Sequence, residues 1–519
     1  MRQSYRQYEG IIIVLLLTFV LGMSGCMQAS RGQGPPPGQQ QPTPLEYPFE
    51  NKNMFFGLSL INPERDAPYV EELGVSWLSL QPHVIWFMVE QQPGVYDWSY
   101  QDKEVKELQA LGLDITMVLS PIINAFGEKR GELTQLVRRY PSIVAFLREG
   151  NVAQLQLYPH DDTLPLWIGF VKAAVDRYDG DGENDMPGLK YQIRNWHFVE
   201  EYPIPELKDE KVYVELLKVT YNAIKGEAPN AKVILAGLAG NYARYFAFAD
   251  GFIEDEEAGV FNRKKYTRSV LASNPLLRDE KDKYEYILRE GKDCFDIIDL
   301  HAYIIKETFM EGEIEYIKQT MQEYGYSKPV WVIEGGGPFK NYPGKRAENT
   351  PADTYFGFGS QKENAEFVVK LHVMSAAKGV ERQHWGLGLE NKEGGYWDGP
   401  WCGMGLMDPD EGFKKPSYYT FQIMQEKLHD FTQVQDLSQG PLRVFSFDVN
   451  KHKVGIVWND QEDSVYMDLS TILCDRELSI THIVTALDAN NSPMYLQDEV
   501  RHSTSVPVSM TPIFIETVQ

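Results

Sequence analysis

The sequence predicts an α/β fold in which a (β/α)8 barrel, the TIM-barrel fold, precedes a small β-sandwich domain. Between residues 49 and 430, eight short apolar runs alternate with helical patterns. This alternation is typical of parallel strands joined by right-handed helical crossovers. After residue 430 the apolar runs become shorter and turn residues separate them, so residues 431–519 are predicted to form the sandwich.

The predicted barrel strands are the apolar runs Phe55–Leu60, Val75–Leu80, Asp114–Leu119, Asn195–Glu200, Lys232–Gly237, Asp296–Leu300, Val330–Ile333 and Gln383–Leu387. Helices are predicted between them at Tyr100–Leu111, Leu164–Tyr178, Val212–Ala228, Ile314–Tyr324 and Glu363–Ala377. The long, charged segment 242–292 is expected to form one wall of a cleft. The sandwich strands are predicted at Leu442–Asp448, Lys453–Trp458, Val465–Leu469, Ile480–Ala486 and Ile513–Thr517.

The first 25 residues have the features of a secretory signal peptide. Arg2 and Arg6 precede an apolar run from Ile11 to Leu21, and small residues lead to Cys26. A cysteine at this place resembles a bacterial lipobox, which implies cleavage before Cys26 and lipid attachment to it. The resemblance places the protein in the cell envelope, lipid-anchored on the non-cytoplasmic side of a bacterial membrane. An uncleaved signal anchor is the alternative.

Residues 26–48 are rich in Gln, Pro and Gly, a composition that cannot offset the entropy of ordering, so they are predicted to be a tether. A net charge of −24 argues against nucleic acid and against an anionic membrane surface, which leaves the lipid as the membrane contact. The oligomeric state stays open. Cys294, Cys402 and Cys474 are too widely spaced for a disulfide framework or a metal site and are predicted to be buried thiols.

One predicted strand ends in an acid that suggests chemistry. The run from Val330 to Ile333 is typical of a strand buried on both faces, and Glu334 and three glycines follow it. The glycines allow a turn and a close approach of a ligand to the backbone. Active sites of parallel barrels lie at the carboxyl ends of the strands, so Glu334 is a candidate catalytic residue. A solvated glutamate at a strand end is the alternative.

A second strand-like run, from Trp196 to Val199, ends at Glu200 and Glu201. Retaining glycoside hydrolysis needs two carboxyl groups about 5 to 5.5 Å apart, one protonated to assist the leaving oxygen and one ionised to attack the anomeric carbon. Acids on strands four and seven of one barrel can meet that need. The reaction requires neither a metal nor an organic cofactor, and none is predicted.

These motifs resemble the clan of retaining (β/α)8 glycoside hydrolases that includes cellulases and β-xylosidases. Residues 196–202 resemble its Trp-x-x-x-Asn-Glu-Pro pattern, and the resemblance implies that Glu201 is the general acid/base. Residues 328–334 resemble its strand-seven pattern and imply that Glu334 is the nucleophile. Residues 94–99, 301–303 and 415–418 resemble further segments of the clan.

The chain departs from the clan beside the acid/base, where Glu200 replaces Asn and Tyr202 replaces Pro. The clan's Asn binds the sugar 2-hydroxyl, so Glu200 is predicted to contact substrate. It could accept that hydrogen bond but could not donate an amide proton. Its charge would raise the pKa of Glu201. A shift of one residue, with Glu200 as the acid, is the alternative.

The resemblance also implies substrate contacts on the other strands. Tyr303 inherits a hydrogen bond to the nucleophile, and His301 is expected to be a neutral hydrogen-bond partner in the pocket wall. Trp385 is expected to stack on a sugar ring, because sugar faces are apolar. Trp86, Trp397, Trp401 and Tyr242 could contribute to the same platform or pack in the core, and His384 is expected to pack behind the barrel.

The sequence therefore predicts a retaining glycoside hydrolase that acts on oligo- or polysaccharides. A non-catalytic carbohydrate-binding lipoprotein, in which Glu200 has impaired the acid step, is one alternative. An adhesive surface protein that binds through its sandwich domain is another. The acidic segment 179–185 lacks the full EF-hand pattern and is predicted to be a polar turn rather than a calcium site.

Overall fold

The computed structural model describes residues 44–517, apart from residues 60, 122–158, 160–162, 203–208, 239–241, 262–263, 305, 338–359, 387–388, 390–403, 409–411, 469–477, 495–498 and 502–504. Among the residues described, no helix combines the length and apolar character needed to cross a bilayer. The predicted signal peptide and most of the tether fall outside them, as do Cys26, Trp397, Trp401, Cys402 and Cys474.

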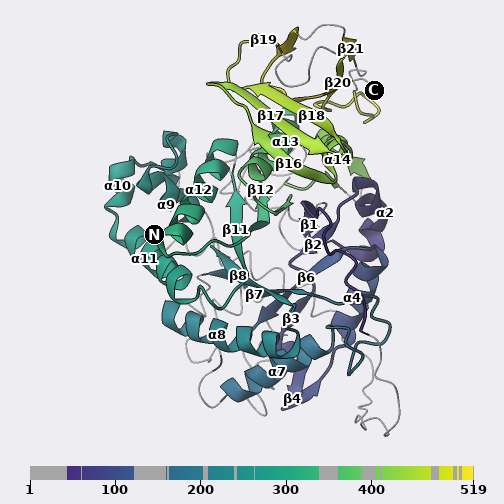
Figure 1. The fold of residues 1–519 in the computed structure, drawn as a ribbon, viewed down its shortest axis with the longest axis vertical. Helices are drawn as coiled ribbons and strands as arrows, with labels where there is room; N and C mark the ends of the chain where they lie inside the picture. The colour runs from purple at the N-terminus through teal and green to yellow at the C-terminus, as the bar shows by residue number, and fades with distance from the viewer. Residues whose placement is uncertain are drawn as a thin grey trace.

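Eight parallel strands close into a barrel, which confirms the predicted fold (Figure 1). Around the barrel they are β1 (Phe56–Ser59), β2 (Trp77–Ser79), β6 (Asp114–Ser120), β7 (Asn195–Tyr202), β8 (Lys232–Leu238), β11 (Ile297–Tyr303), β12 (Val330–Gly336) and β13 (Arg382–His384). The ring closes because β1 pairs with both β13 and β2. Each of the eight predicted runs overlaps one of these strands. A ninth strand, β3 (His83–Ile85), pairs with β6 outside the ring.

Helices surround the barrel, as α2 (Pro63–Leu73), α4 (Ser99–Ala110), α7 (Leu164–Asp176), α8 (Glu210–Glu227), α12 (Glu307–Glu323), α13 (Gln361–Ala377) and α14 (Pro416–Leu428). The five predicted helices are confirmed. The helix α2 was not predicted, although its sequence holds the signals. The Asn62 side chain accepts a hydrogen bond from the Arg65 N–H, and Gly74 ends the helix in the left-handed conformation at φ 65°.

Shorter elements lie between these strands and helices. They are α3 (Trp86–Val89), β4 (Glu90–Gln92), β5 (Val95–Tyr96), α9 (Tyr242–Asp250), η2 (Glu256–Gly259), β9 (Val260–Phe261), β10 (Lys264–Lys265), α10 (Arg268–Ala272), α11 (Pro275–Glu290), β14 (Met407–Asp408) and β15 (Phe413–Lys414). The charged segment 242–292 is therefore largely helical. Its α9 packs against α12, so it thickens the helix layer at that side of the barrel.

The bottom of the barrel is closed by the chain that enters it. Phe49 joins a cluster inside the barrel that includes Trp77 and Trp331, and Tyr47 packs against this cluster. The Tyr47 hydroxyl also donates a 2.7 Å hydrogen bond to Asp114, which forms a buried ion pair with Arg382. The opposite end of the barrel, where the strands have their carboxyl ends, is the end at which this fold carries its active sites.

The C-terminal region is built of β-strands, as predicted. Its six-stranded antiparallel sheet has the order β16 (Phe431–Asp436), β17 (Leu442–Val449), β18 (His452–Asn459), β23 (Ile513–Thr517), β20 (Leu478–His482) and β21 (Glu499–Arg501). The strands β19 (Val465–Asp468) and β22 (Ser505–Val508) pair separately, and β22 contributes Val506 and Val508 to the core on one face of the larger sheet.

The other face of this sheet shares a core with the barrel. Phe445, Phe447 and Trp458 belong to the same buried cluster as the helices α13 and α14, and Figure 1 shows the yellow-green sheet beside these helices. The Thr420 hydroxyl of α14 donates a 2.8 Å hydrogen bond to the carbonyl of Val484. The C-terminal sheet is therefore built onto the barrel.

Candidate active site

A bulge in β7 brings two consecutive acids to the barrel mouth. Phe198 pairs with Leu235 and Glu201 pairs with Gly237, so β7 holds one more residue than β8 over this stretch. Val199, within the bulge, has a φ of 62°, a conformation that is rare for a β-branched residue. In a regular strand Glu200 and Glu201 would point to opposite faces. The extra residue breaks this alternation, so both side chains face inward.

A second bulge positions Glu334 on β12. Asp299 pairs with Trp331 and His301 pairs with Glu334, so β12 holds one extra residue between them. Trp331 and Ile333 both belong to the cluster inside the barrel, and regular alternation would point Glu334 outward. The bulge turns it toward the pocket instead.

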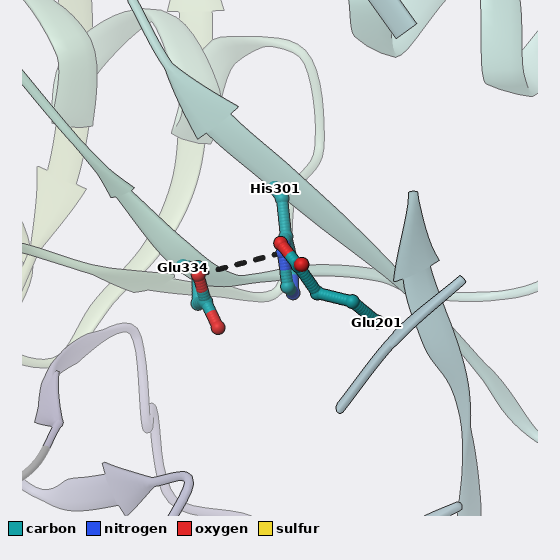
Figure 2. A group of neighbouring side chains, drawn as sticks. All are labelled: Glu201, His301 and Glu334. Carbon is teal, nitrogen blue, oxygen red and sulfur yellow. Dashed lines mark hydrogen bonds and ion pairs between the residues drawn. The ribbon is translucent and has the colours of Figure 1, made fainter. Parts of the chain in front are cut away.

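Glu201, His301 and Glu334 converge from β7, β11 and β12 (Figure 2). Nδ1 of His301 lies 2.9 Å from Oε1 of Glu201 and 3.5 Å from Oε2 of Glu334. One oxygen of Glu201 and one of Glu334 lie within 4.8 Å of each other. Both residues are buried, with 5% of the surface of Glu201 and 1% of the surface of Glu334 exposed to solvent. The structure thus brings together the two acids that the sequence singled out.

His301 is held between carboxylates and favours its charged form. Its Nε2 donates a 2.7 Å hydrogen bond to Asp299, which is itself fully buried. Burial opposes a charge on the imidazole, but Glu334, Asp299 and Glu201 together raise the pKa of His301 well above its usual range. The neutral histidine expected from the sequence is therefore wrong, because three acids surround the ring.

Asp299 was missed in the sequence although a signal was present. Asp299, His301 and Tyr303 alternate along β11 and so share one face of the strand. The alternation that marks His301 and Tyr303 as candidates therefore marks Asp299 as well. His83 on β3 was missed as well. Its Nε2 lies 3.9 Å from Oε2 of Glu200, at the same end of the barrel.

Tyr303 contacts Glu334, as expected. Its hydroxyl donates a hydrogen bond to Oε2 of the carboxyl group. Burial raises the pKa of Glu334 to about 7, while the His301 cation and hydrogen bonds from Tyr303 and Glu200 lower it. Whether Glu334 is ionised near neutral pH therefore depends on its immediate neighbours.

Trp385 does not face the pocket, and its predicted stacking on sugar is wrong. The indole is fully buried, donates a 3.1 Å hydrogen bond to the carbonyl of Met404, and packs against Phe367 and His372 of α13. It directly follows the last residue of β13 and lies on the helix side of the barrel. The position of Trp385 at the end of the last barrel strand was predicted correctly, but the face on which its side chain emerges was not.

Three other candidates are also packing residues. Trp86 is buried against Trp167 and Phe170, and Tyr242 packs against Phe246 of the same helix. His384 is buried, and its ring nitrogens lie against the backbone carbonyls of Ile333 and Gly386. Among the contacts of the described residues, none joins these three side chains to Glu200, Glu201 or Glu334.

Two remaining features lie away from the barrel mouth. In the acidic turn, the Asp185 carboxylate accepts hydrogen bonds from the backbone N–H groups of Gly180 and Gly182, as expected of a polar turn. Carboxylate oxygens of Asp176, Asp179 and Asp181 lie close enough together to contact one cation. Cys294 is a free, partly buried thiol.

Comparison with known proteins shows the fold. No protein-family model matches the sequence, and no curated protein matches it. Among solved structures, a family 39 glycoside hydrolase from Bacteroides cellulosilyticus superposes with a TM-score of 0.56 at 14% identity, over 91% of this chain and 82% of the other. A glucosidase from Croceicoccus marinus gives 0.52 at 11%, over 91% and 98%.

A thermostable family 51 α-L-arabinofuranosidase from Thermotoga petrophila gives a TM-score of 0.51 at 9% identity, over 92% of this chain and 98% of the other. At identities this low, the comparison shows that the folds are similar but does not assign roles to individual residues. The chain therefore has the barrel fold found in these glycoside hydrolases, with two inward-facing acids at the ends of its fourth and seventh strands.

Proposed function

We propose that this protein is a retaining glycoside hydrolase that cleaves O-glycosidic bonds of oligo- or polysaccharides, with Glu334 as nucleophile and Glu201 as general acid/base. The observation that carries the proposal is the separation of the two carboxyl groups, whose oxygens come within 4.8 Å. This spacing suits direct attack on the anomeric carbon. Inverting enzymes need about 6.5 to 9.5 Å, because a water molecule must fit between acid and sugar.

In the first step, an oxygen of Glu334 attacks the anomeric carbon while the bond to the leaving oxygen breaks and Glu201 gives that oxygen its proton. In the second step, Glu201 takes a proton from water, the water oxygen attacks the anomeric carbon, and Glu334 is released. His301 donates to Oε1 of Glu201, which leaves Oε2 as the oxygen that exchanges the proton. The His301 cation also stabilises the ionised form of Glu334.

The location is proposed from the sequence. Lipid attachment at Cys26 and a tether over residues 26–48 would hold the barrel at the cell envelope, on the non-cytoplasmic side of the membrane. The substrate would then be a carbohydrate outside the cytoplasm. Labelling of the expressed protein with a fatty-acid probe, with Cys26→Ala as control, tests this part separately.

The activity is tested with a panel of 4-nitrophenyl glycosides that includes β-D-glucoside, β-D-xyloside and α-L-arabinofuranoside. We expect release of nitrophenol by the wild type and by Glu313→Gln, which changes a buried glutamate on α12. Glu334→Ala should be inactive. Sugar binding by the wild type without turnover would instead support the non-catalytic carbohydrate-binding alternative.

Azide identifies the acid/base. In Glu201→Ala the glycosyl-enzyme lacks a base to activate water, so added azide should restore turnover and yield a glycosyl azide of retained configuration. Rescue of Glu200→Ala but not of Glu201→Ala would show that the acid is Glu200, which the sequence left open.

A further inference from the structure

We propose that Glu200 acts as a neutral carboxylic acid that donates a hydrogen bond to the nucleophile Glu334 and so positions it for attack. This inference rests on the proposed function, because it gives Glu200 a role toward the nucleophile of that reaction. It treats Glu200 as a positioning residue, distinct from Glu201. A neutral carboxylic acid has a donor and an acceptor, as the side-chain amide of Asn does.

The first argument is the contact between the two carboxyl groups. Glu200 and Glu334 are close enough to share a hydrogen bond, and both residues are buried, with 7% and 1% exposed. Ionised carboxylates are acceptors only, so two of them cannot form that bond. A proton must therefore lie on one of the two groups.

The neighbours decide which group holds the proton. Glu334 accepts a hydrogen bond from Tyr303 and lies 3.5 Å from Nδ1 of His301, so its negative charge is stabilised twice. Glu200 has no comparable support among the described residues. His83 approaches it at 3.9 Å, too far for a hydrogen bond, and burial lowers the pKa of His83 to about 4, so it is neutral.

The remaining charges around Glu200 point the same way. Burial and the negative charges of Glu334 and Glu201 raise the pKa of Glu200 well above its usual range, and the more distant His301 cation opposes them. These are the charged groups that face Glu200 from β7, β11 and β12, and His83 faces it from β3. The proton thus belongs on Glu200 and the charge on Glu334.

The second argument is an acceptor that lacks a donor. Oε1 of Glu334 is buried and has no hydrogen-bond partner among the described residues. Buried polar atoms are nearly always paired. A proton on Glu200 supplies the missing donor, so that Tyr303 and Glu200 together hold both sides of the nucleophile.

The proposal predicts a specific dependence on pH. Loss of the Glu200 proton would remove a donor from Glu334 and place a second negative charge beside it. The pH profile of glycoside hydrolysis also contains the ionisation of Glu201, which hides this effect. A 2,4-dinitrophenyl leaving group departs without a proton, so its use removes the requirement for protonated Glu201.

The experiment measures the rate at which 2,4-dinitrophenyl 2-deoxy-2-fluoro-β-D-glucoside and the corresponding β-D-xyloside label the protein, as a function of pH. In the wild type we expect the rate to fall about tenfold per pH unit above the pKa of Glu200. Glu200→Gln keeps a donor that cannot ionise, so it should retain the rate at low pH and lose the alkaline fall. Glu200→Ala should be slower by about ten- to a hundredfold at every pH.

Glu313→Gln should match the wild type. An alkaline fall in Glu200→Gln equal to that of the wild type would overturn the proposal and leave the proposed function intact. Full activity of Glu200→Ala would overturn it as well.

A second measurement needs no substrate. The infrared difference spectrum of wild type minus Glu200→Gln at neutral pH should show the carbonyl band of a protonated carboxylic acid. A carboxylate band in its place would overturn the proposal. If neither glycoside labels any variant, the proposed function has failed for these sugars, and the infrared result alone still decides the state of Glu200.

Discussion

At the scale of single residues, the site is a small set of acids whose charges are set by their neighbours. Glu201 and Glu334 lie beside Nδ1 of His301, and Asp299 holds the far side of the imidazole. Glu200 adds a further acid beside Glu334. Such a cluster is stable only if protons and hydrogen bonds separate the like charges. Each donor to Glu334 therefore affects both its position and its ionisation.

Tyr303→Phe tests this dependence. The hydrogen bond from Tyr303 lowers the pKa of Glu334, which burial raises to about 7. Removal of the hydroxyl should raise that pKa further, so the acid limb of the kcat/KM profile should move to higher pH. Loss of a hydrogen bond to a charged group should also reduce kcat/KM about ten- to a hundredfold at the optimum.

The matched control is Tyr191→Phe, which removes a buried hydroxyl that donates to the carbonyl of Leu113 at the bottom of the barrel. It should leave the acid limb in place. An unchanged acid limb in Tyr303→Phe would show that this hydroxyl does not tune the ionisation of Glu334.

The sequence predicted that Glu201, Glu334, His301 and Tyr303 lie near one another, and the structure brings them together. Acids and polar residues at the ends of buried strands are conspicuous in a sequence. The prediction misplaced Trp385, since the face on which a side chain emerges depends on how the strand ends. The charge on His301 could not be read either, because two of the three acids that produce it, Glu201 and Glu334, come from strands far from β11 in the sequence.

At the scale of elements, bulges in β7 and β12 aim the acids. Both insert one residue just before the end of the strand. Val199 lies in the bulge of β7. Its side chain is buried, and its backbone adopts a left-handed conformation that costs a non-glycine residue about 1–2 kcal/mol. The strain is stored beside the two acids that it positions.

A pair of substitutions at Val199 measures that strain. Both Val199→Ala and Val199→Gly lose the buried side chain, but only glycine relieves the left-handed backbone. Val199→Gly should therefore be the more stable of the two by up to about 1 kcal/mol in urea unfolding.

Val233, which is buried in a regular part of β8, provides the control. There alanine should be more stable than glycine by about 0.5–1 kcal/mol. The same order at both positions would contradict a strained bulge at Val199.

The strands themselves were predictable, since eight apolar runs have the length and spacing that a barrel requires. The bulges were not. Val199 has a high preference for regular strands and no glycine precedes it, so only the register against β8 reveals the extra residue. The helices between residues 242 and 292 were also missed, although α11 carries start signals in its sequence, with Asn274 as the N-cap and Pro275 in the first turn.

At the scale of the whole molecule, the C-terminal sheet is part of the barrel's structure. Phe431 packs against Phe55, which immediately precedes β1, with ring centroids 5.2 Å apart. The hydroxyl of Thr511 donates a hydrogen bond to Glu366 of α13. The shared core argues against an adhesive domain that works independently of the barrel.

Deletion of residues 431–519 should therefore destabilise the barrel. Exposure of the apolar surface on α13 and α14 should cost several kcal/mol, which corresponds to a fall in Tm on the order of 10 °C or to aggregation. Differential scanning calorimetry measures the change.

Tyr466→Ala provides the control, because this side chain is 77% exposed in the same region and its loss should leave Tm unchanged. A soluble truncated barrel with the Tm of the full chain would restore the independent-domain alternative.

The most direct test of the central claim is mass spectrometry of the protein after reaction with 2,4-dinitrophenyl 2-deoxy-2-fluoro glycosides. The fluorine slows hydrolysis of the glycosyl-enzyme, so the covalent intermediate accumulates. We expect one sugar per chain, attached within the peptide that contains Glu334, and no adduct in Glu334→Gln. A stable adduct on another carboxylate, or turnover of the 4-nitrophenyl glycosides by Glu334→Gln at the wild-type rate, would contradict the assignment of the nucleophile.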